Sequence, residues 1–135
     1  MPARTVLDTN ILVSALLAPS GKPARVVDMV IAGEVSVCYD ARILAEYREV
    51  LSRSKFPFRP SESSALIDQL RATGLPVIGA SRISLPDPDD EPFAEVADWT
   101  GAWLVTGNLR HYPGLARAVS PEGFLVSWST PQDGH

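Results

Sequence analysis

Residues 5–17 have the sequence TVLDTNILVSALL, and this stretch decides the fold. A short apolar run, Thr5 to Leu7, ends at the polar residues Asp8, Thr9 and Asn10, and a second apolar segment covers residues 11–17. The first run is typical of a buried strand, and the second is typical of a helix. A strand that leads directly into a helix begins a βα unit, so the stretch predicts an α/β protein.

The rest of the chain repeats this alternation of strands and helices. Val35 to Tyr39 is rich in β-branched and aromatic residues and predicts a second strand. We expect further strands at 75–78, 103–105 and 124–128, and further helices at 22–32, 41–53, 61–73 and 93–99. Such alternation predicts a three-layer fold with a mainly parallel five-stranded sheet flanked by helices. We expect residues 1–135 to form a single domain, because this is an ordinary domain length.

Composition limits the class of protein. Hydrophobic residues make up 45% of the chain and charged residues 21%, which is typical of a globular protein. No apolar run is long enough for a bilayer, and Asp8 and Asn10 interrupt the stretch where a signal peptide needs an apolar core. The single cysteine, Cys38, has no partner within the chain. We therefore expect a cytoplasmic protein without a membrane segment.

The net charge of -4 argues against non-specific binding to a polyanion, which usually needs a basic surface. It does not exclude an enzyme that acts on nucleic acid. Where several acids converge on a metal ion, the ion cancels part of their charge locally.

Polar residues follow two of the predicted strands, and functional groups gather at the carboxyl ends of parallel strands. Asp8 comes directly after the first strand, and Asn108 comes shortly after the fourth. Asp8 could also simply cap the next helix, a role for which Asn10 competes. Asn108 could simply form a turn with Gly107, or it could contribute a carbonyl oxygen to a site.

Two further acidic elements are candidates for the same edge of the sheet. Glu46 lies at the border of the apolar stripe of the predicted helix 41–53, where a carboxylate is costly unless a cation or hydrogen bonds meet it. Its alternative is a surface ion pair with Arg42 or Arg53. Residues 86–92, with the sequence PDPDDEP, place four acids in five positions. This segment is either a solvated acidic loop or a cation site.

Together these elements place carboxylates and one amide on one side of a parallel sheet. Oxygen ligands of this kind suit Mg²⁺ or Mn²⁺ rather than zinc, and the sequence contains no cluster of histidine or cysteine. Such an ion could activate water and stabilise negative charge on a phosphodiester.

Four segments carry a resemblance to a known family: 7–17 (LDTNILVSALL), 43–51 (ILAEYREVL), 87–90 (DPDD) and 104–113 (LVTGNLRHYP). They resemble the PIN-domain family, in particular the VapC-like toxins of prokaryotic toxin–antitoxin pairs. The segments run in the family's order and extend over nearly the whole chain. The resemblance implies a parallel sheet flanked by helices and a metal-dependent endonuclease activity on RNA.

The resemblance also implies roles for individual residues. Asp8, Glu46 and Asp90 would be the catalytic carboxylates and the ligands of Mg²⁺ or Mn²⁺. The residues that would support them are Asn10 and Ser14, which would steady the first ligand, Thr106 and Asn108, which would line the pocket, and Asp87, the second choice within its loop. Asn108 departs from the family, because many relatives carry a fourth aspartate there. This loss of charge should weaken a second metal site, so one ion could suffice, or an RNA phosphate could complete the second site.

Substrate and partners follow from the same resemblance. We expect the metal ion to deliver a hydroxide to the scissile phosphorus of RNA. Arg110 and His111 could hold the substrate backbone, or they could form a solvated turn. A small antitoxin is expected as the protein partner, and homodimers are common in the family. The RNA sequence that is cut is not visible in the chain.

Two unrelated folds are excluded by missing residues. A phosphoacceptor receiver domain would need paired acids after the first strand and a lysine after the last, but the only lysines are Lys22 and Lys55. A phosphate-binding NTPase would need a glycine five residues before Gly21, and none is present.

The serious alternative is a PIN-like module that binds a protein or RNA partner with weak or no catalysis. Asn108 and the acidic pI favour this alternative. The presence of Asp8, Glu46 and Asp90 favours catalysis.

Overall fold

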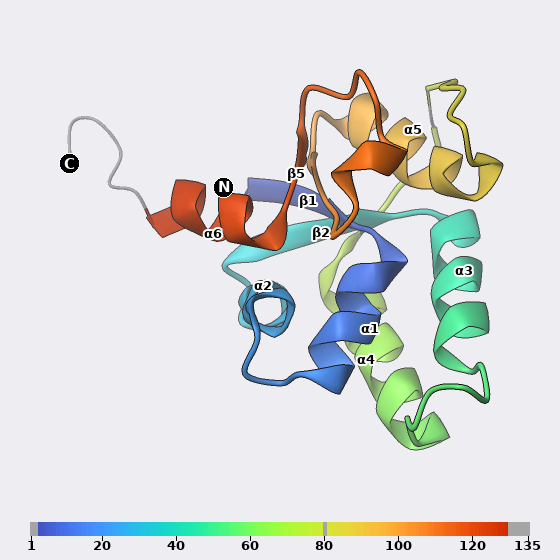
Figure 1. Ribbon diagram of the computed structural model, residues 1–135, viewed down its shortest axis with the longest axis vertical. Helices are drawn as coiled ribbons and strands as arrows, with labels where there is room; N and C mark the ends of the chain where they lie inside the picture. Colours follow the sequence, from blue (N-terminus) through green and yellow to red (C-terminus); the bar gives the residue numbers. More distant parts are fainter. Residues whose placement is uncertain (1–2, 80, 130–135) are drawn as a thin grey trace.

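A five-stranded parallel sheet forms the centre of the protein, as seen in the computed structural model, which describes residues 3–79 and 81–129 (Figure 1). The strand order is β3-β2-β1-β4-β5, and each neighbouring pair is parallel. The strands are β1 (Ala3–Leu7), β2 (Val35–Tyr39), β3 (Leu75–Pro76), β4 (Trp103–Val105) and β5 (Ala118–Val119). The predicted fold class is therefore confirmed.

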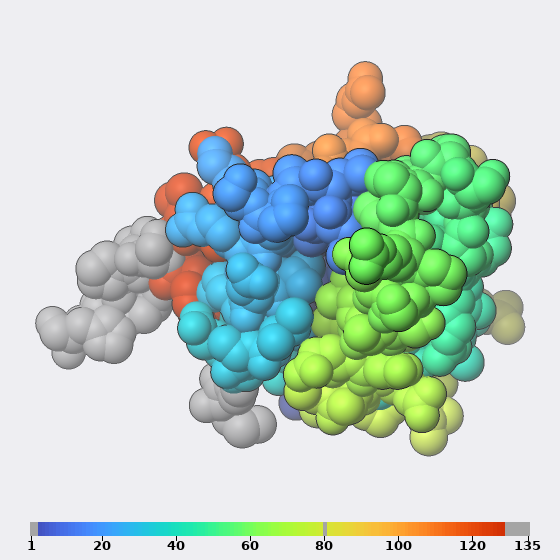
Figure 2. Space-filling view, turned by 90° about the horizontal axis from the view of Figure 1, so that it is seen from below, coloured from blue at the N-terminus to red at the C-terminus, as the bar shows by residue number. Residues whose placement is uncertain are grey.

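Six helices flank the sheet in the described residues. They are α1 (Thr9–Leu17), α2 (Lys22–Ile31), α3 (Ala41–Leu51), α4 (Pro60–Thr73), α5 (Glu91–Thr100) and α6 (Pro121–Ser129). Two short 3₁₀ helices are also present, η1 (Pro88–Asp90) and η2 (Leu109–His111). Helix α5 covers one face of the sheet, and α1, α2 and α4 cover the other (Figure 1). Figure 2 shows this second face from below, with α1 and α2 in blue beside the green α3–α4 region.

The central strand fixes the position of the site. β1 pairs with β2 on one side and with β4 on the other, in the register Thr5↔Val37 and Leu7↔Val105. The chain moves outward from β1 to β2 and β3, and then crosses to β4 on the opposite side of β1. The strand order thus reverses between β1 and β4, and ligands of open parallel sheets bind beyond the strand ends at such a point.

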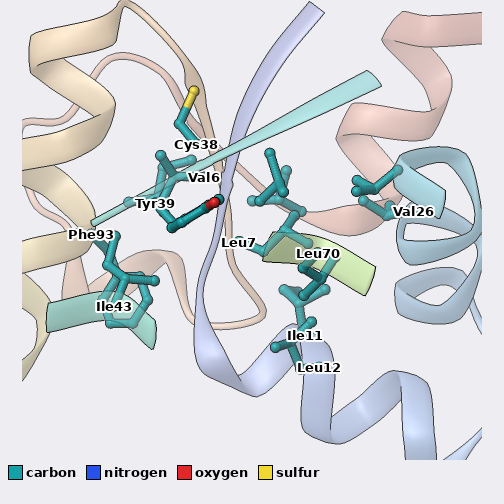
Figure 3. Packing of buried hydrophobic residues seen from close by; sticks show 14 of the residues in the cluster. Val6, Leu7, Ile11, Leu12, Val26, Cys38, Tyr39, Ile43, Leu70 and Phe93 are labelled. Atoms are coloured by element: carbon teal, nitrogen blue, oxygen red, sulfur yellow. The ribbon is translucent and has the colours of Figure 1, made fainter. Parts of the chain in front are cut away.

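Apolar side chains from both helical layers hold β1 in place. Val6 and Leu7 are completely buried, and the large buried side chains of Ile11, Tyr47 and Phe93 pack in the same core (Figure 3). Because each of these side chains is removed from water, each contributes about 1.5–3 kcal/mol of burial free energy. The polar residues that follow β1 therefore stand on a rigid strand.

One strand prediction is wrong. The segment 124–128 lies within α6, and the fifth strand is instead β5 (Ala118–Val119). Pro121 occupies the first position of the helix, where its missing N–H has no cost, and the rings of Phe124 and Trp128 stack at helical spacing with centroids 6.3 Å apart. The alternation of strand and helix thus continues to the end of the described residues.

The other predicted elements are present, with ends shifted by a few residues. β3 is shorter than predicted and spans only Leu75–Pro76. In the part of the chain that the structure describes, no helix is long and apolar enough to cross a membrane.

Candidate metal centre

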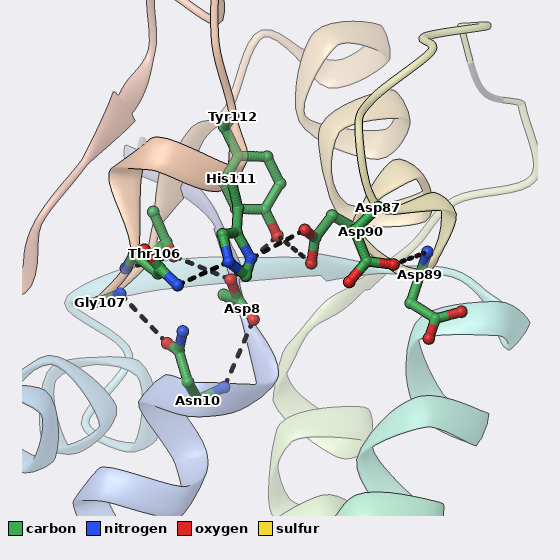
Figure 4. A network of polar contacts seen from close by, with 10 residues as sticks. Asp8, Asn10, Asp87, Asp89, Asp90, Thr106, Gly107, His111 and Tyr112 are labelled. Atoms are coloured by element: carbon green, nitrogen blue, oxygen red, sulfur yellow. Dashed lines mark hydrogen bonds and ion pairs between the residues drawn. The ribbon is translucent and has the colours of Figure 1, made fainter.

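Asp8 and Thr106 meet at the carboxyl edge of the sheet because they follow neighbouring strands. The Asp8 N–H donates to the Val105 carbonyl at 3.0 Å, which continues the pairing of β1 with β4. The Thr106 hydroxyl donates to Asp8 Oδ2 at 2.8 Å (Figure 4). Both residues are buried. The bond joins two residues 98 positions apart, so the topology of the sheet, and not local sequence, creates it.

The Asp8 carboxylate has two different environments. Oδ1 accepts the Asn10 N–H at 3.4 Å, so Asp8 does cap α1, although this bond is long. Oδ2 accepts from Thr106 and also from the Tyr112 hydroxyl, at 2.9 Å. Asn10 is not the cap; it lies inside α1, and its Oδ1 accepts the Gly107 N–H at 3.1 Å. Capping therefore explains only one of the two Asp8 oxygens.

Asp90 reaches the same place from η1. Its side chain is buried, and Oδ1 lies 3.5 Å from the Tyr112 hydroxyl that binds Asp8. Oδ2 lies 3.0 Å from His111 Nδ1, an ion-pair distance when the imidazole is protonated, and this oxygen is buried without a hydrogen-bond partner in the described residues. Burial raises the pKa of the Asp90 carboxyl, and the negative charge of Asp8 raises it further, against a smaller opposing effect of His111.

Glu46 is half-buried on α3 and forms no hydrogen bond or ion pair among the described residues. Burial raises the pKa of its carboxyl, and the charges of Asp89, Glu49 and Asp8 add to the effect, against a smaller opposing effect of Arg53. No cation therefore forms an ion pair with Glu46 in the described residues.

The surface ion pairs considered for Glu46 do not form. Arg42 instead binds Asp40 at 2.8 Å and Glu95 at 2.7 Å. Arg53, which lies just beyond the end of α3, binds Glu49 of that helix at 2.7 Å. Both cations thus bind other acids, which leaves Glu46 without an ion-pair partner in the described residues.

Helix η2 closes a ring of polar contacts around the site (Figure 4). The Asn108 N–H donates to Thr106 Oγ1 at 3.0 Å, and Asn108 Nδ2 lies 2.8 Å from His111 Nε2. Contacts therefore run in a circle, in the order Asp8, Thr106, Asn108, His111, Asp90, Tyr112 and back to Asp8. The ring joins two carboxylates that would otherwise repel each other.

The donor set fits a divalent cation. One ligand atom each from Asp87, Asp90 and His111 lie within 4.8 Å of one another. Asp90 contributes the buried oxygen that has no hydrogen-bond partner, which is a costly arrangement unless a cation meets it. Asp87 is exposed and uses one oxygen to accept the Asp89 N–H at 3.0 Å.

Not every predicted site residue joins the network. Ser14 is half-buried, and Arg110 is exposed; neither side chain makes a contact with the acids within the described residues. His111 does join it, although the sequence shows no histidine cluster. The structure therefore places a nitrogen that could bind a metal ion in a site that was predicted from oxygens alone.

Tyr112 was not among the predicted site residues. Only 2% of it is exposed, and burial, followed by the charges of Asp8 and Asp90, raises the pKa of its hydroxyl. The sequence does hold one indication, because a buried tyrosine hydroxyl needs a partner and Tyr112 closely follows the polar turn after β4. That indication identifies no partner, because the path of η2 decides where the ring points.

Comparison with known proteins agrees with this arrangement. A family model for the PIN domain matches residues 4–110. No curated protein sequence is significantly similar to the chain. Among solved structures, the fold is similar to the crystal structure of VapBC2 from Rickettsia felis bound to a DNA fragment from their promoter, with a TM-score of 0.56, 16% identity, and coverage of 87% of this chain and 96% of that one. At this identity the likeness concerns the fold alone, but the family model spans well over half of the sequence, and the chain therefore belongs to the PIN domain family.

Proposed function

We propose that this protein is a metal-dependent endoribonuclease that hydrolyses phosphodiester bonds in RNA. The observation that carries the proposal is the carboxylate oxygen of Asp90, which is buried beside the Asp8 carboxylate without a hydrogen-bond partner in the described residues. A buried acid in this state is stabilised by a cation, and perturbed acids tend to mark functional sites. Membership of the PIN domain family supports the same activity.

Asp8, Glu46 and Asp90 would hold Mg²⁺ or Mn²⁺, since all three supply the oxygen ligands that these ions prefer. When bound, the ion activates water and stabilises the negative charge that develops on the phosphate. Glu46 has no ion-pair partner in the described residues, so its carboxylate is free to act as a ligand. Asp87 and Asn108 lie beside this set and would complete the pocket.

The protein's own residues would orient the acids and the substrate. Thr106 and Tyr112 both donate to Asp8 Oδ2 and so fix the carboxylate before any ion arrives. Asn10 ties α1 to the backbone of Gly107 and holds the two sides of the pocket together. The exposed guanidinium of Arg110 lies on the adjacent 3₁₀ turn and would contact backbone phosphates of the RNA.

A protein partner is the second part of the proposal. The solved structure described above is that of VapBC2 from Rickettsia felis bound to promoter DNA. By analogy with that complex, we propose that a small antitoxin binds this chain and that the chain is the toxin of the pair.

One observation favours the alternative of a binding module with weak catalysis. Asn108 stands at the edge of the pocket without a charge, and its amide contacts His111 rather than an acid. The site consequently holds less negative charge than one with an aspartate at this position. A quantitative cleavage assay separates the two functions.

The test is cleavage of a mixed RNA pool by the purified full chain, with Mg²⁺ or Mn²⁺ and with EDTA. We expect cleavage that requires metal and that falls to background in Asp8→Asn. The matched control is Asp68→Asn, an exposed acid on α4 outside the site, which should cleave like the wild type. Thermal melts verify that both variants fold. Undiminished cleavage by Asp8→Asn, or cleavage in EDTA, would refute the proposal.

A further inference from the structure

Two residues of the polar ring, His111 and Asn108, are not explained by a carboxylate site for Mg²⁺. We propose that His111 ligates a metal ion through Nδ1 together with Asp90 and Asp87, that Asn108 orients its imidazole, and that the site consequently selects a first-row transition-metal ion over Mg²⁺. The inference rests on the proposed function in one respect, since Asp90 belongs to both ligand sets. It goes further, because it concerns the identity of the ion.

The position of the imidazole carries the first step. His111 Nδ1 lies 3.0 Å from Asp90 Oδ2, which is the buried oxygen without a hydrogen-bond partner in the described residues. Asp90 is 9% exposed, so water does not readily solvate that oxygen. No hydrogen bond to Oδ2 is present in the described residues. An ion between the two atoms would satisfy both at once.

Asp87 supplies the third ligand. One carboxylate oxygen of Asp87, one carboxylate oxygen of Asp90 and one ring nitrogen of His111 lie within 4.8 Å of one another. Metal–ligand distances for nitrogen and carboxylate oxygen are about 2.0–2.2 Å, so small rotations of the two exposed side chains, Asp87 and His111, bring all three atoms to one ion. Their exposure also leaves coordination positions open to water or to a substrate phosphate.

Asn108 acts as a positioning residue for the imidazole. Its amide nitrogen lies 2.8 Å from His111 Nε2, the ring nitrogen that points away from Asp90. A histidine that ligates metal through one nitrogen usually donates the other N–H to a fixed acceptor. A half-turn of the Asn108 amide exchanges its oxygen and nitrogen, and Oδ1 then accepts from Nε2–H. The backbone of Asn108 is itself held by Thr106, which fixes this acceptor in place.

The nitrogen ligand determines which ion is preferred. Mg²⁺ is bound through oxygen and keeps several waters, whereas imidazole favours transition metals. An asparagine in place of a fourth acid therefore does more than remove a charge. It exchanges an oxygen ligand for a histidine that the same asparagine orients.

The test measures metal binding directly on the metal-stripped full chain. Mn²⁺ affinity is obtained from the EPR signal of free Mn²⁺, and Mg²⁺ affinity from competition against Mn²⁺. Pulsed EPR of bound Mn²⁺, with natural-abundance and ¹⁵N-histidine protein, detects a directly coordinated nitrogen. Because the chain contains only two histidines, the background for this experiment is small. We expect a nitrogen coupling in the wild type that changes with the isotope.

Variants locate the nitrogen. His111→Asn should abolish the coupling and weaken Mn²⁺ binding at least tenfold while changing Mg²⁺ binding less than twofold. Asn108→Ala should weaken Mn²⁺ binding roughly 10–100-fold, as expected for loss of the partner that orients a metal ligand. Leu109→Ala, an exposed neighbour on the same turn, is the matched control and should leave both affinities unchanged. Thermal melts establish that each variant is folded.

The outcomes separate this inference from the proposed nuclease. Two results would overturn the inference: no histidine nitrogen coupling in the wild type, or an equal loss of Mn²⁺ and Mg²⁺ binding in His111→Asn. Either result would overturn it even if the protein cleaves RNA and this cleavage depends on Asp8. A coupling that is lost in His111→Asn supports it, including in a protein that cleaves no RNA, in which case the proposed function alone fails.

Discussion

The Tyr112 hydroxyl stands between two buried carboxylates, and Tyr112→Phe removes it without changing the shape of the ring. The hydroxyl donates to Asp8 Oδ2 at 2.9 Å, and its 3.5 Å contact with Asp90 is too long to add much. A hydrogen bond to a charged group contributes about 1.5–3 kcal/mol. Because Thr106 still donates to the same oxygen, we expect the free energy of unfolding to fall by about 2 kcal/mol in the absence of metal.

The assay is thermal unfolding in EDTA and in saturating Mg²⁺ or Mn²⁺. For a chain of 135 residues, 1 kcal/mol corresponds to roughly 3–5 °C, so Tm in EDTA should fall by about 6–10 °C. A bound cation stabilises the same carboxylates, and with metal the fall should be less than half as large. Tyr39→Phe is the matched control, since its hydroxyl donates to the neutral Arg71 carbonyl at 2.8 Å. It should lower Tm equally in both conditions.

Two results would refute this reasoning. A fall of less than about 1 °C for Tyr112→Phe in EDTA would mean that the hydroxyl contributes little to stability. A fall of the same size with and without metal would mean that the cation and the hydroxyl do not serve the same carboxylates.

Three further predictions concern stability. Burial raises the pKa of both Glu46 and Asp90, so the neutral replacements Glu46→Gln and Asp90→Asn should each raise Tm in EDTA, measured by calorimetry. The same replacements should weaken Mn²⁺ binding, measured by EPR. A lowered Tm in EDTA would contradict this prediction. Because folding raises the pKa values of Glu46 and Asp90, the stability that these two acids contribute is present below their unfolded pKa values of about 4 and is lost as the pH rises through their folded pKa values. Over this pH range, Tm in EDTA should therefore decline more steeply in the wild type than in the double variant Glu46→Gln/Asp90→Asn. Equal slopes for the two proteins would contradict this prediction. Gly74→Ala would place a Cβ 2.6 Å from the Leu70 carbonyl oxygen and 2.7 Å from that of Val37, so denaturant unfolding should show a loss of about 1–3 kcal/mol, and an unchanged midpoint would exclude such a close approach.

Local sequence pattern predicts most of the elements because each carries its own periodicity and end signals. The stretch Val35–Tyr39 has the β-branched and aromatic residues of a strand, and it is one from end to end. Pattern fails at residues 124–128, where a short apolar run fits a strand and a helix equally well. The deciding residue is Pro121, which begins α6.

The candidate site was predictable as far as the chain's own topology determines it. A residue that directly follows a parallel strand must lie at its carboxyl edge, which brings Asp8 and Thr106 together across neighbouring strands. His111 is the last residue of the three-residue 3₁₀ helix η2 and Tyr112 directly follows it, and the path of this helix depends on contacts with other segments. No local pattern gives the direction of their side chains, so their places opposite Asp90 and Asp8 become visible only in the structure.

The acids of this chain fall into two groups, and the difference supports a role for the uncompensated group. Burial alone would raise the pKa of Glu95, yet hydrogen bonds from Arg42 and from the Ile83 N–H outweigh it and lower that pKa. Glu46 has no ion-pair partner in the described residues and Asp90 lies against a histidine instead of an arginine, and burial raises the pKa values of both. Arginine side chains thus neutralise Asp40, Glu49 and Glu95, but no arginine in the described residues forms an ion pair with Glu46 or Asp90. Two acids without an arginine or lysine partner in the described residues reduce the stability of the metal-free protein, and a bound divalent cation would restore that stability.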